Sequence, residues 1–440
     1  MKEIELPRDF LLGSATAATQ IEGGDKNSNW YHWSLKGKIE GGASSLTAAD
    51  HWNRVEEDIA LMKEMNQEIY RMSLEWSRIE PDESVWSDEG IEHYRRELTL
   101  LKEAGIEPLV TLHHFSHPQW FEDKGAWAST ESVGFFIRFT SKVVETLGEL
   151  IGEYCTINEP NVFVNDTYMD GKYPPGHKDD IRSYFKASRN LILAHLEAYE
   201  LIHRMREERG WKGTRVGMAI HLAWFEKGDG NPLAGLSLKL MDYSFHSLFL
   251  KGMVEGRLSF PVGSGHPRGK GLFCDFIGIN YYSRHLIHSS LNPATLFGEV
   301  RVEENLPDDR LNDLGWEIYP EGLYRTVGKT FEKYGLPVYI TENGIPDARD
   351  AKRARFIYDH MAQIRKLLDE GVDVRRYYHW SLLDNLEWND GYGPRFGLIE
   401  VDYETQERRI RESGRFYGEL CSGKKITQGM MDRYLPGYRK

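Results

Sequence analysis

The stretch "YITENG", residues 339–344, ends a run of strand-forming residues in a carboxylic acid. Its first three residues favour a buried strand, whereas the Asn-Gly pair after Glu342 favours a turn. A second stretch, "CTINEP" at residues 155–160, has the same order, because a β-favouring run ends in Asn158 and Glu159 before a proline. The two patterns therefore predict two strands that each carry an acid at the carboxyl end.

Similar β-favouring runs recur along the whole chain and alternate with polar loops and longer helical patterns. The patterns "VEEDIALMKEMN" and "IYDHMAQIRKLLDEG" have apolar residues at three- and four-residue spacings, as amphipathic helices do. No Pro-, Gly- or Ser-rich linker interrupts the alternation, so we expect a single (β/α)8 barrel, an α/β fold, over residues 1–440. The eight predicted strands are Phe10–Thr16, Glu68–Leu74, Pro108–His113, Tyr154–Asn158, Arg215–His221, Phe276–Tyr281, Val338–Glu342 and Arg376–Ser381.

Composition limits the partners of the protein. A formal charge of −13 without a long basic run argues against nucleic acid and anionic membranes. Charged residues interrupt the N-terminal stretch where a signal peptide needs an apolar core, and no apolar run approaches a membrane span. The three cysteines are odd in number and far apart, which disfavours disulfides and zinc sites. We expect a soluble, cytoplasmic protein with a small neutral ligand and no metal or cofactor.

The carboxyl ends of barrel strands carry catalytic groups, because loops open to solvent there while the interior is packed. Glu159 and Glu342 end the fourth and seventh predicted strands. Cleavage of a glycosidic bond needs a proton donor for the leaving oxygen and a nucleophile or an activated water at the anomeric carbon. Two facing acids supply both functions, and aromatic and amide side chains suit a sugar's apolar faces and hydroxyls.

Eight stretches in the same order resemble the glycoside hydrolase family 1 β-glycosidases across nearly the whole chain. They are "FLLGSATAATQIEG", "YRMSLEWSRIEP", "GIEPLVTLHHF", "TINEPN", "DFIGINYYS", "YITENG", "WSLLDNLEW" and "GYGPRFGLIEVD". The resemblance implies a (β/α)8 fold and hydrolysis of terminal non-reducing β-D-glucosyl residues, with β-D-fucosyl and β-D-galactosyl residues as further substrates. It implies no cofactor and leaves the oligomeric state open.

The resemblance also implies roles for individual residues. Glu342 is expected to be the nucleophile and Glu159 the general acid/base of a double displacement through a covalent glycosyl-enzyme, with retained anomeric configuration. Arg71 is expected to lower the pKa of Glu342 by its positive charge, and Tyr282 to donate a hydrogen bond to it. Asn158 is expected to bind the 2-hydroxyl in the transition state.

The remaining residues implied by the resemblance bind the glycone. Gln20 and Glu387 are expected to hold adjacent hydroxyls, and His114 to bind the 3-hydroxyl. The expected floor of the sugar site is Trp380, with Trp388 in the same aromatic set, and Phe396 is expected near the exocyclic carbon. Leu386, Ser116 and His117 depart from the usual family pattern beside these residues, which leaves the substrate range open.

Other interpretations remain open at this point. Arg71 could bridge two strands without touching substrate, and His113, His114 and His117 could suggest a metal site. Tyr281 fits core packing better than Tyr282 does. The protein could be a catalytically silent sugar-binding protein, a structural protein on the same barrel, or a 6-phospho-β-glycosidase. Glu387 argues against the last, since a carboxylate repels a phosphate.

Overall fold

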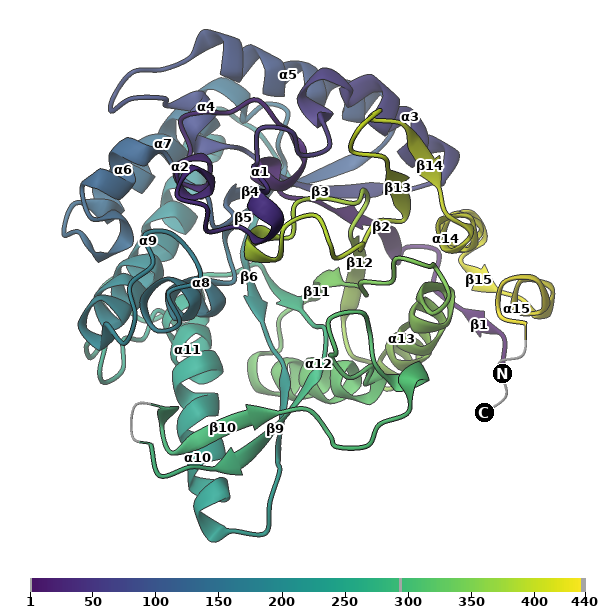
Figure 1. The fold of residues 1–440 in the computed structure, drawn as a ribbon. Coiled ribbons are helices and arrows are strands. Elements are labelled where there is room, and N and C mark those ends of the chain that lie inside the picture. Colours follow the sequence, from purple (N-terminus) through teal and green to yellow (C-terminus); the bar gives the residue numbers. More distant parts are fainter. Residues whose placement is uncertain (1, 293–294, 437–440) are drawn as a thin grey trace.

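The computed structural model describes residues 2–292 and 295–436, and a closed barrel of eight parallel strands lies at its centre (Figure 1). The barrel order is β11-β12-β2-β3-β4-β5-β6-β8, and β8 returns to β11. The predicted (β/α)8 fold is confirmed, and the largest shift is at the last strand, which begins at Val374 instead of Arg376. The strands are β2 (Leu11–Ala15), β3 (Ile69–Ser73), β4 (Glu107–His113), β5 (Glu153–Asn158), β6 (Arg215–His221), β8 (Phe276–Asn280), β11 (Val338–Asn343) and β12 (Val374–Trp380).

The barrel closes through strands from the two ends of the chain, because β12 pairs with β2 from Arg376 opposite Leu11 to Trp380 opposite Ala15. The strand interiors are almost fully buried, as expected for a parallel sheet covered on both faces. All eight carboxyl ends meet at one end of the barrel. In the register there, Glu342 of β11 lies opposite Asn280 of β8.

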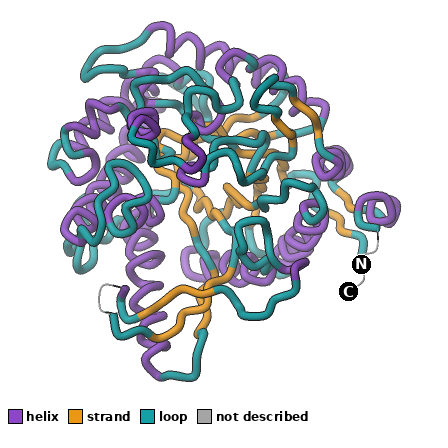
Figure 2. Tube along the Cα trace, in the orientation of Figure 1, coloured by secondary structure: helices purple, strands orange, loops and turns teal. Residues whose placement is uncertain are grey.

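Helices surround the strands, as Figure 2 shows in purple around the orange barrel. The two predicted helical patterns correspond to α3 and α13, and α13 begins four residues before the predicted start at Ile357. The helices are α1 (Ala18–Ile21), α2 (Asn29–Leu35), α3 (Val55–Glu64), α4 (Trp76–Ile79), α5 (Asp88–Glu103), α6 (Gln119–Asp123), α7 (Ser132–Leu147), α8 (Pro160–Tyr168), α9 (Ile181–Glu208), α10 (Pro232–Asp242), α11 (Leu248–Glu255), α12 (Pro320–Tyr334), α13 (Arg353–Asp369), α14 (Glu412–Gly423) and α15 (Gln428–Tyr434).

Three smaller sheets lie outside the barrel. A three-stranded sheet has the order β10-β9-β7, and β9, β10 and α10 project from the barrel below α11 in Figure 1. A π-helical turn, η4 (Tyr243–Ser247), joins α10 to α11. The outer strands are β7 (Trp224–Lys227), β9 (Arg284–Ser289), β10 (Gly298–Arg301), the pair β1 (Ile4–Glu5) and β15 (Lys425–Ile426), and the pair β13 (Ile399–Val401) and β14 (Arg408–Ile410).

Two further features bear on the sequence-based expectations. Cys155, Cys274 and Cys421 are all buried, and none forms a disulfide. Within residues 2–292 and 295–436, no helix combines the length and apolar character needed to cross a membrane.

Candidate active site

Glu342 lies near the carboxyl end of β11 and is held by two donors from other parts of the barrel. Arg71 Nη1, on β3, donates to Oε1 at 2.5 Å, and the Tyr282 hydroxyl, just after β8, donates to Oε2 at 2.6 Å. Arg71 is fully buried, and Glu342 is 3% exposed. Both carboxylate oxygens therefore accept hydrogen bonds, which fixes the orientation of the carboxylate and favours its charged form.

Glu159 connects β5 to α8 and has a left-handed backbone, with φ of 40° and ψ of 58°. This conformation is uncommon for a residue with a side chain and is frequent at active sites. Its Oε1 accepts a hydrogen bond from Asn280 Nδ2 at 2.8 Å and lies 3.4 Å from His221 Nδ1. Asn280 and His221 were not among the predicted site residues. Asn280 ends a buried strand in a polar group, as Asn158 does, so the sequence signal for it was present.

Asn158 contacts both Arg71, which binds Glu342, and Asn280, which binds Glu159. Its Oδ1 accepts from Arg71 Nη2 at 2.6 Å and from Asn280 Nδ2 at 3.0 Å, and its Nδ2 lies 3.0 Å from His114 Nε2. A continuous set of hydrogen bonds thus runs from Glu342 through Arg71, Asn158 and Asn280 to Glu159. The fold brings together two acids that are 183 positions apart in the sequence (342 − 159).

Opposing influences act on the pKa of Glu342. Burial raises it to about 7, and the positive charge of Arg71 is the largest opposing influence. The negative charge of Glu159 raises it further, while the hydrogen bonds from Tyr282 and Arg71 lower it. The lowering effect expected of Arg71 is present, but removing the carboxylate from water outweighs it.

Three of the residues expected to bind the glycone each have an unpaired polar atom. Within the described residues, Gln20 Oε1, His114 Nδ1 and Glu387 Oε2 are buried without a hydrogen-bond partner. The other end of Gln20 is fixed, because Nε2 donates to Asn385 Oδ1 at 2.9 Å and to the Leu386 carbonyl at 2.8 Å. Buried polar atoms normally have partners, so unpaired ones indicate a place for ligand groups.

Aromatic rings accompany these polar atoms. The His114 ring lies 5.8 Å from Trp380 and 6.0 Å from Trp388, stacked with each at angles near 25°. Phe396 contacts Tyr282 at 6.2 Å between ring centroids. Trp316, a residue that was not predicted, contacts both Tyr282 at 6.0 Å and Phe396 at 6.3 Å. It follows Gly315 in a long loop without regular periodicity, so no pattern marked it.

Glu387 lies on the loop after β12, and the residue is half-buried. Burial raises its pKa well above the usual value, and the negative charges of Asp390 and Glu342 add to this effect. A hydrogen bond from Trp380 acts in the opposite direction. The raised pKa favours the protonated form of Glu387, in which the carboxyl can both donate and accept hydrogen bonds.

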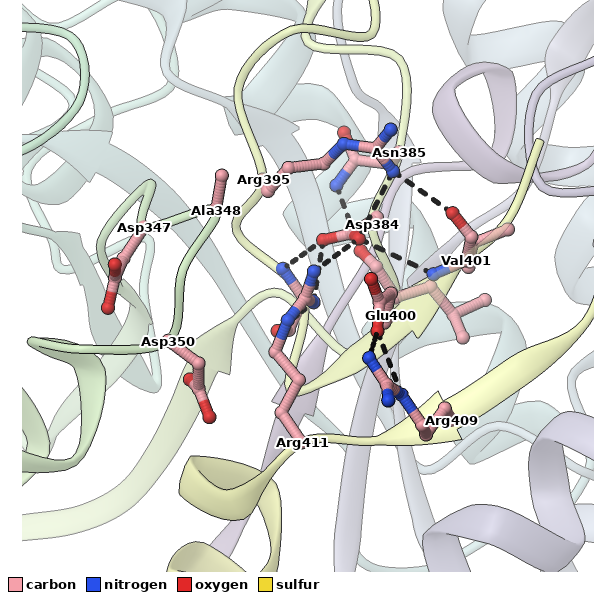
Figure 3. A network of polar contacts seen from close by, with 12 residues as sticks. Asp347, Ala348, Asp350, Asp384, Asn385, Arg395, Glu400, Val401, Arg409 and Arg411 are labelled. Atoms are coloured by element: carbon pink, nitrogen blue, oxygen red, sulfur yellow. Dashed lines mark hydrogen bonds and ion pairs between the residues drawn. The ribbon is translucent and has the colours of Figure 1, made fainter.

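A buried ion-pair network supports the loop that carries Glu387, Trp388 and Phe396. Figure 3 shows Asp384 beside Arg411 and Arg395. Arg411 donates to both oxygens of Asp384, at 2.9 and 2.8 Å, and Arg395 donates at 3.3 Å. The backbone N–H of Gly397 also donates to Asp384, at 3.0 Å. Both ends of the loop are thereby tied to one carboxylate.

Other polar residues near the strand ends form separate contacts. The Tyr281 hydroxyl donates to the Tyr319 carbonyl at 2.6 Å, away from Glu342. His113 Nε2 accepts from Trp127 at 3.1 Å, and His117 Nε2 lies 2.8 Å from Glu122. Within the described residues, no group of three His, Cys, Asp or Glu side chains has the arrangement of a metal site.

A (β/α)8 barrel with two acids at its strand ends is an arrangement found in barrel-type glycoside hydrolases. Comparison with known proteins narrows the class. The family model for glycosyl hydrolase family 1 matches residues 2–261 and 271–426. Beta-glucosidase A of Acetivibrio thermocellus is 34% identical, over 96% of this chain and 99% of its own length. The beta-glucosidase of an Agrobacterium species is 32% identical, over 95% of each chain.

Solved structures agree with the sequence relatives. A beta-glycosidase from Pyrococcus horikoshii superposes with a TM-score of 0.91 and 35% identity, over 100% of this chain and 99% of its own. The family 1 beta-glucosidase of Thermotoga maritima superposes with a TM-score of 0.87 and is 31% identical, over 97% of this chain and 100% of its own. The chain belongs to glycosyl hydrolase family 1, and it is a retaining glycoside hydrolase of the β-glucosidase type.

Proposed function

We propose that the protein hydrolyses terminal non-reducing β-D-glucosyl residues, and also β-D-fucosyl and β-D-galactosyl residues, with Glu342 as nucleophile and Glu159 as general acid/base. The observation that carries this proposal is that the two carboxylates accept hydrogen bonds from different kinds of donor. Glu342 accepts from a cation and a tyrosine hydroxyl, whereas Glu159 accepts from a neutral amide and, among residues 2–292 and 295–436, has no arginine or lysine within ion-pair distance. The first environment suits an anion, and the second suits a group that gives and takes a proton.

In the first step Glu342 attacks the anomeric carbon while Glu159 gives its proton to the leaving oxygen. In the second step Glu159 takes a proton from water, and the water oxygen attacks the anomeric carbon from the face that the leaving group occupied, opposite the bond to Glu342, so that the Glu342 carboxylate is released. Arg71 and Tyr282 hold the attacking carboxylate, and Asn158 meets the 2-hydroxyl as positive charge develops on the ring. The retained configuration expected for this sequence requires carboxyl groups about 5 Å apart.

The proposed glycone site uses the unpaired polar atoms. Gln20 and Glu387 take neighbouring hydroxyls, His114 takes the 3-hydroxyl, and the rings of Trp380, Trp388 and Phe396 contact the apolar surfaces of the sugar. This set accepts an axial or an equatorial 4-hydroxyl, which supports the inclusion of galactosides and fucosides. We infer a small-molecule β-glycoside as the partner, with no cofactor.

An unphosphorylated sugar is favoured over a 6-phosphate, although the reason differs from simple repulsion by an anion. Burial raises the pKa of Glu387, which favours its neutral form. The charges that act most strongly on it are the carboxylates of Asp390, Glu342 and Glu159, not cations. A phosphate dianion bound there would meet negative charge and would lack a cationic partner.

Two further proposals concern the whole chain. We infer that residues 1–440 form one domain, since the first and last barrel strands pair directly. We also infer a reducing compartment such as the cytoplasm, because the three cysteines are unpaired.

Nitrophenyl glycosides test the assignment of the two acids. Glu342→Ala should lose almost all nitrophenyl β-glucoside hydrolysis, and added azide should restore release with formation of the α-glucosyl azide. Glu159→Ala should keep glycosylation by the activated nitrophenyl leaving group, and azide should give the β-glucosyl azide. Equal hydrolysis by the wild type and Glu342→Ala would overturn the mechanism, and exchanged azide products would reverse the two roles.

A further inference from the structure

His221 is a titratable side chain beside Glu159 that takes no part in the two proposed steps. It ends strand β6, and in the barrel register it lies opposite Asn280 of β8. Its Nδ1 lies 3.4 Å from Glu159 Oε1, the same oxygen that accepts from Asn280 Nδ2 at 2.8 Å. Two neighbouring strand ends therefore direct a nitrogen at one oxygen of the proposed proton donor.

The ring of His221 packs against two aromatic rings. It stacks on Tyr282 at 6.0 Å between ring centroids and 19° between planes, and the Phe245 ring meets it at 6.1 Å and 79°. The backbone is fixed as well, because Asn161 Nδ2 donates to the His221 carbonyl at 2.8 Å. These contacts fix the orientation of the imidazole, whose side chain is only 16% exposed.

The titratable side chains around His221 come from several parts of the fold and are Glu159, Tyr282, His246 and His285. Burial lowers the pKa of His285 to about 3, and it also lowers the pKa of His246, although Asp242 acts in the opposite direction. Burial raises the pKa of Tyr282 well above its usual value of 10. None of these three groups therefore loses a proton between pH 7 and 10, the range in which a general acid must keep its own.

We propose that His221 is a positioning residue for Glu159, whose Nδ1–H donates to Oε1 and so keeps the reactive proton on Oε2, toward the leaving oxygen. This inference rests on the proposed function, since it gives a partner to the acid/base of that reaction. An oxygen that accepts two N–H groups is the carbonyl oxygen of a neutral carboxyl, so the proton belongs to the other oxygen. A distance of 3.4 Å is long for a hydrogen bond, and such contacts in active sites often shorten when substrate binds.

The contact acts in both steps of the reaction. In the first step Glu159 passes the Oε2 proton to the leaving oxygen, and the N–H groups of Asn280 and His221 stabilise the resulting anion at Oε1. In the second step Oε2 takes a proton from water, while Oε1 keeps the same two donors. His221 itself neither gains nor loses a proton, so the proton balance of hydrolysis is unchanged.

Two substitutions at position 221 separate the hydrogen bond from the packing. His221→Phe keeps a ring against Tyr282 and Phe245 but removes the donor. His221→Asn removes the ring but keeps an N–H donor, on a nitrogen attached to Cγ as Nδ1 is. With phenyl β-glucoside, whose leaving group needs the proton, kcat/KM of His221→Phe should fall about tenfold. His221→Asn should stay within about threefold of the wild type, and a loss equal to that of His221→Phe would overturn the proposed hydrogen bond.

Dinitrophenyl β-glucoside provides a second measurement, because its leaving group departs without protonation. In His221→Phe its kcat/KM should stay within about twofold of the wild type. Its kcat, which depends on the second step, should fall about tenfold and recover with added azide, because azide needs no base. Equal losses of kcat/KM with the phenyl and dinitrophenyl substrates would overturn the proposal, since general damage to the fold lowers both.

The pH profile gives a third, independent measurement. Without the donor the ionised form of Glu159 is less stable, so Glu159 keeps its proton to higher pH. The alkaline limb of kcat/KM for phenyl β-glucoside should therefore move up by about one pH unit in His221→Phe, and it should keep its wild-type position in His221→Asn. An alkaline limb that does not move in His221→Phe would contradict the role of His221.

His203→Phe is the control at the other end of the barrel. His203 Nε2 lies 2.8 Å from Asp275 Oδ2, and Asp275 comes just before β8, whereas the two acids lie at the carboxyl ends of their strands. The variant should keep the wild-type ratio of kcat/KM for phenyl and dinitrophenyl β-glucosides. A change in that ratio as large as in His221→Phe would overturn the proposal.

The outcomes separate this inference from the proposed function. Normal hydrolysis with the same substrate ratio and the same alkaline limb in the wild type and His221→Phe would overturn only the role of His221. Failure of the wild type to hydrolyse any of these glucosides would overturn the proposed function itself.

Discussion

Glu342 must be charged to attack, yet it is buried, and the balance of these effects decides the pH at which it works. Burial raises its pKa to about 7, and Arg71 and Tyr282 act against this. Only the ionised fraction reacts, so kcat/KM should fall as the pH decreases through about 7, well above the usual range of a glutamate. The acidic limb of the pH profile measures this directly, and a limb near 4.5 would contradict the raised pKa.

Removing the Tyr282 hydroxyl tests whether its hydrogen bond lowers the pKa of Glu342. In Tyr282→Phe the ionised carboxylate loses one hydrogen bond, so the pKa of Glu342 should rise and the acidic limb should move to higher pH. Loss of a hydrogen bond to a charged group costs about 1.5–3 kcal/mol, which corresponds to a decrease of roughly 10- to 150-fold in kcat/KM. Tyr281→Phe is the matched control, since its hydroxyl donates to Tyr319. If both variants shift the limb equally, the effect is not specific to the nucleophile.

The raised pKa of Glu387 makes the stability of the folded protein depend on pH. In the unfolded chain its carboxyl ionises near pH 4.5, whereas burial raises the pKa well above this value in the folded protein. The folded form therefore binds the proton more tightly, and the associated stabilisation, present at low pH, is lost as the pH rises toward the folded-state pKa. Glu387→Gln removes this dependence, so its Tm relative to wild type should increase from pH 5 to pH 8.

The size of this effect has an upper limit of about 1.4 kcal/mol for each pH unit between the two pKa values. Calorimetry at several pH values measures it. The same variant should hydrolyse glucosides more slowly, because the amide cannot reproduce both hydroxyl contacts proposed for the acid. A Tm difference that is constant between pH 5 and 8 would show that Glu387 does not titrate differently in the two states.

At the scale of elements, the loop between β12 and β13 depends on one buried ion pair. Arg411 binds both oxygens of Asp384, and the side chains are 6% and 0% exposed. Arg411→Met leaves a buried carboxylate short of its main partner, which typically costs about 3–5 kcal/mol. The loop carries Glu387 and Phe396, so kcat/KM should fall as well.

Arg409 provides a matched control for this prediction on strand β14, next to Arg411. It binds Glu400, as Figure 3 shows, but its side chain is 79% exposed. Surface pairs contribute about 0–1 kcal/mol, so Arg409→Met should change stability and activity little. Chemical denaturation and glucoside kinetics of the two variants check the difference, and similar losses in both would show that burial of the pair is not decisive.

At the scale of the whole molecule, the sequence predicted the barrel well because buried parallel strands have continuous apolar runs that end in polar groups. The strand that ends before Glu159 and the strand that contains Glu342 are both of this type. The sheet β10-β9-β7 was not predicted, since β7 is short and only partly buried. The net pKa of Glu342 could not be predicted from the sequence, because burial is a sum over neighbours from the whole fold. Trp316 was missed because its loop has no periodic pattern.

The closed barrel also predicts how the molecule unfolds. Strand β2, near the start of the chain, pairs with β12, near its end, through five residue pairs, and the site combines residues from β3, from β11 and from the segment just after β8. Loss of any strand leaves two strand edges unpaired, so we expect no part of the barrel to be stable without the rest. Unfolding by guanidinium should therefore give coincident transitions by tryptophan fluorescence, far-UV circular dichroism and loss of glucosidase activity. A separate transition that leaves half of the helical signal would show that residues 1–440 contain more than one folding unit.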